Sequence, residues 1–509
     1  MAQPLPAGQI QTATETSAQC QAGALPASPR LPTDLAEATL SARQSLANKL
    51  LVLAVLGLAA GAYAYSMDRS LVANETYSAL AAFQPSIGLV AQNALRFDPG
   101  KPVLYHILLH WFCGIFGHSE ASIRAMSMFF GVATLALLFA LGQDLFGFGI
   151  GIVAALLWAF NPEAVATARL GRMYTLFTTL ALAHVLALSR LRYKQTLSAS
   201  ALAGLAGGAM LYTHLDGVLI IAADCAVVVR EFRRNGRSLT LPAVIFSLLL
   251  FSPFLPVAVA ETRALLFAHW LDWIGAPQQH SATFKLVIGV LASAPILWMM
   301  LARRRVSERS ESFQRCLIYV SLPVLALIAA SLIVRPMFQI RYVNPSCAFA
   351  ALVLAYLLGK GGSRARNLAA AAVTALLFAT FALHTGQPGP WPRIAAQIRT
   401  SGSPVEPIVF ESQDPGTDDA GGEFPDGFLR VPFDFYFHGS NPRLAVSGTD
   451  PIEAAKSITA EALNSGGAWL ISAKGLQGAA AELPRNNDVR IASVNQYSHV
   501  VVVHLLRNH

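Results

Sequence analysis

Four positively charged side chains lie in polar stretches that interrupt long apolar runs: Lys101, Arg169, Arg172 and Arg341. A guanidinium group can bind a phosphate through two parallel hydrogen bonds, and a lysine ammonium group binds it as a point charge. Such groups are costly to bury at membrane depth unless an anion is nearby. Their types and positions therefore indicate a site for a phosphate-like anion.

Two acidic side chains that could accept a proton precede these cations in the chain. Glu75 and Asp98 are carboxylates and can take a proton from a hydroxyl group, whereas the neighbouring Asn74 cannot accept one at neutral pH. Ring side chains stand in the same kind of stretch: Tyr105, Tyr174, His214 and Tyr342. The chemistry that such a set could support is proton abstraction from a hydroxyl group beside a bound phosphate.

The elements that must position these residues are mostly membrane helices. Of the 509 residues, 54% are hydrophobic and only 13% are charged, whereas soluble domains average about 25% charged residues. Apolar runs recur between residues 48 and 383, and several are long enough to cross roughly 30 Å of hydrocarbon. The formal net charge of +8 comes largely from short loops between these runs. This distribution is typical of membrane topology, so we expect no nucleic-acid partner.

Basic clusters between the apolar runs predict the topology. The clusters begin at Arg190, Arg230, Arg303 and Lys360, and two apolar runs separate each successive pair. All four clusters therefore fall on one side, which the positive-inside rule makes cytoplasmic. We expect about 11 crossings, with the N-terminus in the cytoplasm and the C-terminus outside. The expected spans are residues 50–65, 125–141, 149–160, 173–189, 198–213, 218–229, 241–260, 285–302, 316–334, 343–359 and 368–381.

The apolar run at residues 103–116 does not fit this alternation. It is short for a crossing, and it carries His106 and His110, so we expect a juxtamembrane or re-entrant helix. The alternative is an even number of crossings, with this run spanning the bilayer. In the first case the outer face carries residues 67–124, 161–172 and 335–342, which His214 and Asp216 join from the outer end of a span.

The two ends of the chain differ from the membrane part. Residues 1–47 are rich in Ala, Pro, Ser, Thr and Gln, and we expect a disordered cytoplasmic tail. Residues 386–509 regain polar residues, Gly and Pro. Expected strands at 407–410, 444–447, 468–472 and 500–505, with helices at 391–398 and 452–465, indicate a small α/β domain outside the cytoplasm. Residues 48–385 then form the membrane domain between these ends.

The order of short motifs resembles bacterial glycosyltransferase family 39 and its relatives, the protein O-mannosyltransferases and the lipid A aminoarabinose transferases. The motifs that match are Asn74-Glu75-Thr76-Tyr77; Lys101-Pro102-Val103-Leu104-Tyr105; Gly117, Ser119, Glu120 and Arg124; Arg169, Arg172, Met173 and Tyr174; Tyr212-Thr213-His214; and Arg341-Tyr342. The resemblance covers about residues 50–381 and implies the GT-C fold. It also implies a juxtamembrane place for the Lys101 segment, as the topology does.

The resemblance implies a glycosyltransferase of the bacterial inner membrane. Such an enzyme takes a sugar from a polyprenyl-phosphate-linked donor and passes it, with inversion, to a lipid, glycan or protein acceptor on the periplasmic side of the bilayer. The residues that would be catalytic are Glu75, Asn74 and Asp98. The residues that would bind substrate are Lys101, Tyr105, Arg169, Arg172, Tyr174, His214, Arg341 and Tyr342.

Asn74 departs from the family pattern, which has an aspartate at the catalytic position. Glu75 or Asp98 could serve as the base instead, or Asp68 could be the true partner in a shifted register. A third alternative is a catalytically inactive GT-C protein that binds the lipid without turnover, or an enzyme with an unusual acceptor. Metal-binding relatives have an acid before the lysine, where this chain has Gly100, so no cofactor is certain and a divalent metal stays an option. A lipid or solute transporter is a less favoured class, because no internal repeat is evident and the polar residues gather at one face.

Overall fold

The computed structural model describes residues 31–98, 100–191, 195–266, 308–334, 338–360, 389–411, 427–446, 450–483, 488–497 and 500–508, with the single positions 371 and 375. It divides into two compact units, Met1–Leu53 and Ala54–His509. The expected boundary at residue 386, the expected span 285–302 and most of the expected span 368–381 lie outside the described residues, as do residues 303–305.

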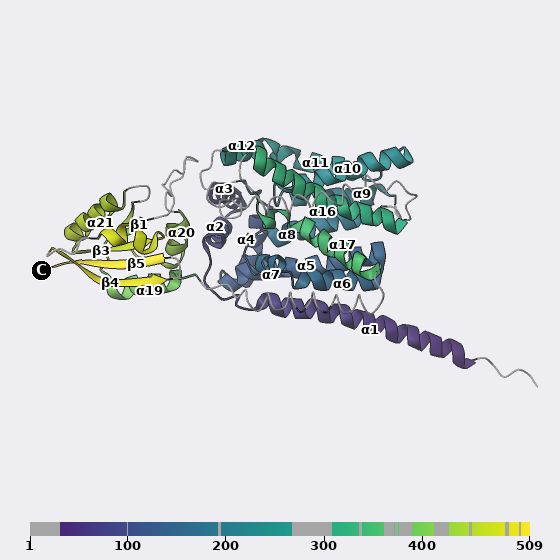
Figure 1. Cartoon of the computed structure of the whole chain (residues 1–509), viewed down its shortest axis with the longest axis horizontal. Helices are drawn as coiled ribbons and strands as arrows, with labels where there is room; N and C mark the ends of the chain where they lie inside the picture. Colours follow the sequence, from purple (N-terminus) through teal and green to yellow (C-terminus); the bar gives the residue numbers. More distant parts are fainter. Residues whose placement is uncertain are drawn as a thin grey trace, which may run out of the picture. The chain divides into compact units, whose positions relative to one another are not determined.

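The membrane part is built of helices (Figure 1). They are α1 (Leu31–Ala64), α2 (Ala73–Ala82), α3 (Ile87–Phe97), α4 (Leu104–Phe116), α5 (Glu120–Phe146), α6 (Phe148–Ala159), α7 (Pro162–Ala168), α8 (Tyr174–Arg190), α9 (Leu197–Leu211), α10 (Gly217–Asn235), α11 (Leu241–Phe251), the 3₁₀ turn η1 (Ser252–Phe254), α12 (Leu255–Leu266), α16 (Glu308–Ile333), the 3₁₀ turn η2 (Ile340–Val343) and α17 (Asn344–Lys360). The first helix begins at Leu31, so part of the segment expected to be disordered is helical.

Several of these helices can cross a membrane by length and composition. Within the described residues five segments qualify: Gln44–Ala64, Glu120–Phe146, Leu241–Arg263, Glu311–Ile333 and Ile340–Lys360. A sixth is obtained if α6 and α7, which meet at an angle of 67°, form one broken span. Helix α4 has 13 residues and is therefore only about 20 Å long, which is shorter than the hydrocarbon layer. The predicted fold class, a mainly helical membrane protein with a small C-terminal sheet, is confirmed.

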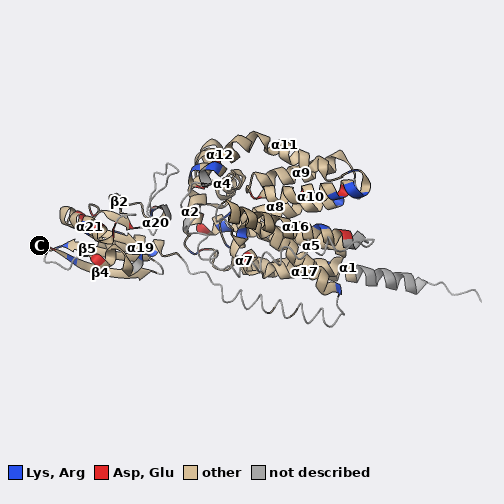
Figure 2. Cartoon of the chain, turned by 45° about the horizontal axis from the view of Figure 1, so that its top comes forward, with Lys and Arg blue, Asp and Glu red and all other residues tan. Residues whose placement is uncertain are grey.

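Charged residues are scarce along the helices. Figure 2 shows the middles of the membrane helices almost entirely uncharged, with Lys, Arg, Asp and Glu gathered toward the two ends of the bundle. Helices α5 and α6 approach each other closely because both have glycine at the contact: a Cβ atom on Gly142 would lie 2.7 Å from Gly151 Cα. An added methyl group has no room there, so this helix pair depends on the two glycines.

A buried polar network joins α8, α10 and α16 inside the bundle. His184 Nε2 lies 3.0 Å from Asp224 Oδ2, and Tyr319 donates a hydrogen bond of 2.6 Å to Asp224 Oδ1. All three side chains are buried. The other ring nitrogen, His184 Nδ1, lies 2.7 Å from the carbonyl oxygen of Ala203. That oxygen can only accept, so Nδ1 carries a proton, and the contact between Nε2 and Oδ2 needs one further proton, on either partner. The histidine and the aspartate therefore have no net charge as a pair.

We predict that Asp224→Asn is tolerated and that Asp224→Ala is not. An asparagine can donate to His184 and accept from Tyr319, so it keeps the network without any charge. Alanine leaves a buried nitrogen and a buried hydroxyl group unpaired, at about 1–3 kcal/mol each. Thermal unfolding in detergent should show a much lower Tm than wild type for Asp224→Ala and a nearly unchanged Tm for Asp224→Asn. An asparagine variant as unstable as the alanine variant would contradict a pair that is neutral in total.

The C-terminal part is a five-stranded sheet with helices. The sheet has the order β2-β1-β3-β5-β4, in which β2, β1 and β3 are parallel and β5 pairs antiparallel with β3 and β4. Its elements are α19 (Trp391–Ser401), β1 (Ile408–Glu411), α20 (Gly427–Tyr436), β2 (Arg443–Ala445), α21 (Pro451–Ser465), β3 (Gly467–Ser472), the 3₁₀ turn η3 (Gly475–Gln477), α22 (Ala479–Glu482), β4 (Val489–Tyr497) and β5 (Val500–Arg507). The four expected strands and two expected helices are present. Helix α20 and strand β4 were not predicted, and β4 is an edge strand with little buried surface.

Candidate active site

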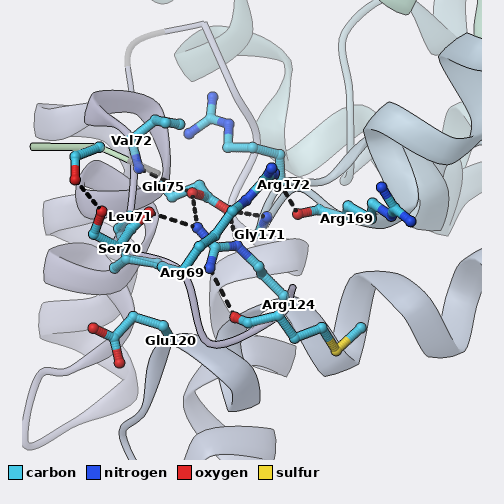
Figure 3. A network of polar contacts seen from close by, with 12 residues as sticks. Arg69, Ser70, Leu71, Val72, Glu75, Glu120, Arg124, Arg169, Gly171 and Arg172 are labelled. Atoms are coloured by element: carbon cyan, nitrogen blue, oxygen red, sulfur yellow. Dashed lines mark hydrogen bonds and ion pairs between the residues drawn. The ribbon is translucent and has the colours of Figure 1, made fainter. Parts of the chain in front are cut away.

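The first outer segment is organised around a buried ion pair between Glu75 and Arg124 (Figure 3). Glu75 is the third residue of α2, and Arg124 lies in the second turn of α5. Arg124 Nη2 is 2.6 Å from Glu75 Oε2, and Arg124 Nε donates a hydrogen bond of 2.8 Å to Glu75 Oε1. The remaining donors of Arg124 bind the carbonyl oxygens of Met67, Arg69 and Ser70. The pair therefore holds the entry to α2 against α5.

The carboxylate of Glu75 has no free capacity. Besides Arg124, it accepts hydrogen bonds from the backbone N–H groups of Val72 and Gly171, at 3.0 and 2.8 Å. The bond to the Val72 amide satisfies a backbone donor at the start of α2, as the glutamate of a capping box does, although the valine side chain cannot complete such a box. The side chain is 0% exposed, so a substrate hydroxyl group cannot reach it in this structure.

Asp98 is held by Arg172. The two guanidinium terminal nitrogens of Arg172 lie 2.9 and 2.6 Å from the two carboxylate oxygens of Asp98. Arg172 also donates to the backbone oxygen of Asn74 and to the hydroxyl group of Ser78, both at 2.9 Å. Burial alone would lower the pKa of Arg172, but Asp98 raises it above its usual value. The predicted residues Asn74, Asp98 and Arg172 are therefore in contact.

Lys101 enters a cluster of rings because the chain turns sharply before it. Gly100 has a φ of 76°, a conformation that glycine adopts at little cost, and its N–H group donates a hydrogen bond of 2.8 Å to Glu261 Oε2. Lys101 Nζ then lies 4.7 Å from the ring centroid of Tyr342. Burial lowers the pKa of Lys101, but the nearby oxygens of Tyr342, Tyr174, Asp216 and Asp98 raise it above its usual value, so Lys101 is a cation.

The ring cluster gathers residues from three further parts of the chain. The ring centroids of Tyr174 and Tyr342 are 6.4 Å apart, and that of His214 lies 5.9 Å from the first and 5.5 Å from the second. The guanidinium carbon of Arg341 is 5.8 Å from the ring of Tyr174. The cluster therefore places Lys101, Arg341, Tyr174, Tyr342 and His214, all expected to bind substrate, side by side.

His214 and Asp216 stand in the turn between α9 and α10. The backbone N–H of Asp216 donates a hydrogen bond of 3.2 Å to His214 Nδ1, and Asp216 Oδ2 lies 3.3 Å from the same nitrogen. Within the described residues, His214 Nε2 and Asp216 Oδ2 are buried atoms with no hydrogen-bond partner. Burial and the charges of Lys101 and Arg172 lower the pKa of His214 well below its usual value, so the ring is neutral. Burial raises the pKa of Asp216 to about 6, although Lys101 opposes this shift.

Two of the expected binding residues lie elsewhere. Arg169 donates two hydrogen bonds, of 3.1 and 2.6 Å, to the carbonyl oxygen of Ala62 near the end of α1. These bonds cap the C-terminal end of α1. The guanidinium group also lies 5.3 Å from the ring of Tyr65. Tyr105 is fully buried, with its hydroxyl group 3.4 Å from Ser127 Oγ. In this structure the side chain of Tyr105 packs between α4 and α5 and does not reach solvent.

Comparison with known proteins identifies the fold. The sequence matches the family model of dolichyl-phosphate-mannose-protein mannosyltransferases over residues 100–257. The structure is similar to ArnT from Cupriavidus metallidurans in the apo state, with a TM-score of 0.60 and 14% identity, over 90% of this chain and 98% of ArnT. The chain has the GT-C fold. The same ArnT bound to undecaprenyl phosphate matches with a TM-score of 0.58 and 13% identity, over 89% of this chain and 97% of ArnT. A search of curated protein sequences found no match.

The resemblance to GT-C proteins seen in the motifs is confirmed, but the motifs did not show which ion pairs and hydrogen bonds connect the site residues. Arg124 belongs to one of the motifs, which do not predict a role for it, and in the structure its guanidinium group neutralises Glu75. Glu261, which binds the Gly100 amide, gave no sequence signal beyond being an acid near the end of a predicted span. No three His, Cys, Asp or Glu side chains converge as metal ligands in the part of the chain that the structure describes.

Proposed function

We propose that this chain transfers a sugar from a polyprenyl-phosphate carrier to an acceptor, with inversion, at the outer face of the bacterial inner membrane. The observation that carries the proposal is the cluster of Lys101, Arg341 and His214 around the rings of Tyr174 and Tyr342. Two cations and an unpartnered ring nitrogen suit a phosphate group that gains negative charge as it leaves the sugar.

The fold supports a lipid-linked donor. ArnT, which has the same fold, has been solved with undecaprenyl phosphate, and the matching family model is named for dolichyl-phosphate-mannose as its donor. Both names specify a polyprenyl or related lipid phosphate. The sugar and the acceptor of this chain are left to experiment, and lipid, glycan and protein acceptors all stay within the proposal.

We propose that the N-terminus is cytoplasmic and that residues 386–509 form a periplasmic domain. The basic clusters support this orientation, because they all fall on one side of the predicted topology. The site residues then lie on the other side, where a carrier lipid would present its sugar to a periplasmic acceptor.

The experiment that tests the function compares lipids from a strain that lacks the gene with those of its parent. Mass spectrometry of the polyprenyl-phosphate fraction should show one sugar-charged carrier accumulating in the mutant, while one glycoconjugate loses the same sugar. The purified protein in nanodiscs should then transfer that sugar from the accumulated carrier. Unchanged carrier lipids and glycoconjugates would contradict the proposal.

A second candidate function is lipid binding without turnover, which Asn74 favours because the family has an aspartate there. The substitution Asn74→Asp separates the two. A general base contributes about 10²–10⁴-fold to a rate, so an enzyme that lacks its base should gain at least about 100-fold. Because we propose that another group accepts the proton, we predict that transfer by this variant changes less than about tenfold. A wild-type chain that binds undecaprenyl phosphate without transfer, combined with a large gain in this variant, would favour the second candidate.

A further inference from the structure

We propose that Asp216 accepts the proton of the acceptor hydroxyl group, and that its neutralisation frees Lys101 to hold the leaving phosphate. The inference rests on the sugar transfer proposed above. The motif resemblance implies a base in the first outer segment, whereas Asp216 lies outside that segment, in the turn between α9 and α10.

The other carboxylates near the cluster are engaged or lie with another cation. Glu75 is enclosed by Arg124 and two amides, and Asp98 is paired with both terminal nitrogens of Arg172. Glu261 accepts the Gly100 amide. Glu163 lies near Arg341, whose charge acts on it. Asp98 and Asp216 both lie near Lys101 and both have a buried oxygen without a hydrogen bond, but that oxygen of Asp98 is 2.6 Å from Arg172 Nη1. Asp216 is therefore the one of these two carboxylates that has no guanidinium partner within the described residues.

The contact between Asp216 and His214 is arranged to receive a proton. His214 Nδ1 already accepts the backbone N–H of Asp216, so the neutral ring carries its own proton on Nε2. Nδ1 and Asp216 Oδ2, 3.3 Å apart, are then both acceptors, and the ionised carboxylate gains nothing from this neighbour. A protonated Asp216 can turn its hydroxyl group toward Nδ1 and form a hydrogen bond. The carboxylate side chain is 24% exposed, so its other edge can meet a substrate.

In the part of the chain that the structure describes, the charged and titratable groups that act on Asp216 or lie beside it include Lys101, His214 and Tyr342. His214 is neutral, and the hydroxyl group of a tyrosine such as Tyr342 ordinarily keeps its proton at neutral pH. Lys101 is therefore the cation shared by the carboxylate and an incoming phosphate. A carboxyl group whose pKa lies near the working pH is well matched to general-base catalysis, and Asp216 has a pKa of about 6.

The proposed step balances in atoms and charge. The acceptor oxygen forms a bond to C1 of the sugar, and the bond from C1 to the phosphate oxygen breaks, with both electrons staying on the phosphate. The acceptor proton moves to Asp216. The carboxylate loses one negative charge as the phosphate gains one, so the total charge beside Lys101 stays constant. Lys101 thus exchanges one anionic partner for another without either being left unpaired.

The test measures undecaprenyl phosphate binding to the full-length protein in nanodiscs from pH 5 to pH 8, for the wild type and Asp216→Asn. A bound phosphate disfavours a neighbouring carboxylate, so wild-type affinity should fall, relative to the variant, as pH rises through about 6. The ionisation of the lipid phosphate itself is common to both proteins and cancels in the ratio of the two Kd values. We expect a ratio near one at pH 5 and about tenfold tighter binding by the variant at pH 8, which corresponds to a shift of about one pKa unit.

Transfer provides the second readout, with the donor lipid that accumulates in the deletion strain. The Asp216→Asn variant should lose about 10²–10⁴-fold in kcat while it keeps or improves its lipid affinity. If Asp216 only held Lys101 in position, the variant would misplace the lysine and would lower both kcat and lipid affinity. Asp144→Asn, which removes an exposed ion pair with Arg190, is the matched control and should change neither quantity.

The outcomes separate the two proposals. Wild-type protein that fails to bind undecaprenyl phosphate or to transfer a sugar would overturn the proposed function. Wild-type protein that binds and transfers, with an Asp216→Asn variant of unchanged pH profile and rate, would overturn the assignment of Asp216 alone. The assignment of Asp216 would also be overturned if Glu163→Gln, and not Asp216→Asn, showed the pH-dependent change in lipid affinity and the loss of kcat.

Discussion

Arg124→Met should destabilise the protein by about 3–5 kcal/mol, the usual effect of removing one partner from a buried ion pair. Both partners are 0% exposed, so the variant leaves the Glu75 carboxylate in a site without a counter-charge. It also removes the donors that bind the carbonyl oxygens of Met67, Arg69 and Ser70. Thermal unfolding of the purified protein in detergent should show a markedly lower Tm, and limited proteolysis should cut the segment before α2.

The matched control is Arg190→Met. Its ion pair with Asp144 is exposed, with side-chain exposures of 55% and 29%, and such surface pairs contribute about 0–1 kcal/mol. A Tm for Arg124→Met within the range of this control would show that the outer segment does not depend on the buried pair. A second variant, Glu75→Gln, keeps the shape of the side chain, and its Tm should lie between those of Arg124→Met and Arg190→Met.

Lys101→Met should weaken undecaprenyl phosphate binding by about 10- to 100-fold, because a hydrogen bond to a charged group is worth about 1.5–3 kcal/mol. Transfer should fall further than binding, since the charge on the phosphate increases as the sugar leaves. The measurement is the Kd for undecaprenyl phosphate in nanodiscs, followed by the transfer rate with the native donor lipid. Lys101→Arg keeps the charge but has a different shape, so we expect partial binding.

Lys360→Met offers a close control for this prediction. Lys360 Nζ lies 5.0 Å from the ring centroid of Tyr356, much as Lys101 lies against Tyr342, but it ends α17 in a cluster expected to be cytoplasmic. Binding and transfer should be unchanged in this variant. If both lysine variants lost affinity equally, the ammonium group of Lys101 would have no special role at the site.

Some features of the fold could be predicted from the sequence, and others could not. The membrane helices and four of the five strands were predictable because long apolar runs and short buried strands are local patterns. Strand β4 was missed because only one of its faces is partly buried, which leaves a polar-rich sequence. The early start of α1 at Leu31 was missed because an Ala- and Ser-containing segment has no apolar period to mark a helix.

The sequence by itself determined that this is a membrane protein and indicated which stretches share its outer face, because hydropathy and loop charge depend on composition along the chain. It could also name most of the site residues from motif order. Only the tertiary structure decided what each charge does. Glu75 and Arg124 are 49 positions apart, and Arg172 and Asp98 are 74 apart. An acid's capacity to accept a proton depends on such distant partners, so one carboxylate is a structural anchor at Glu75 and another, at Asp216, keeps an oxygen without a hydrogen bond.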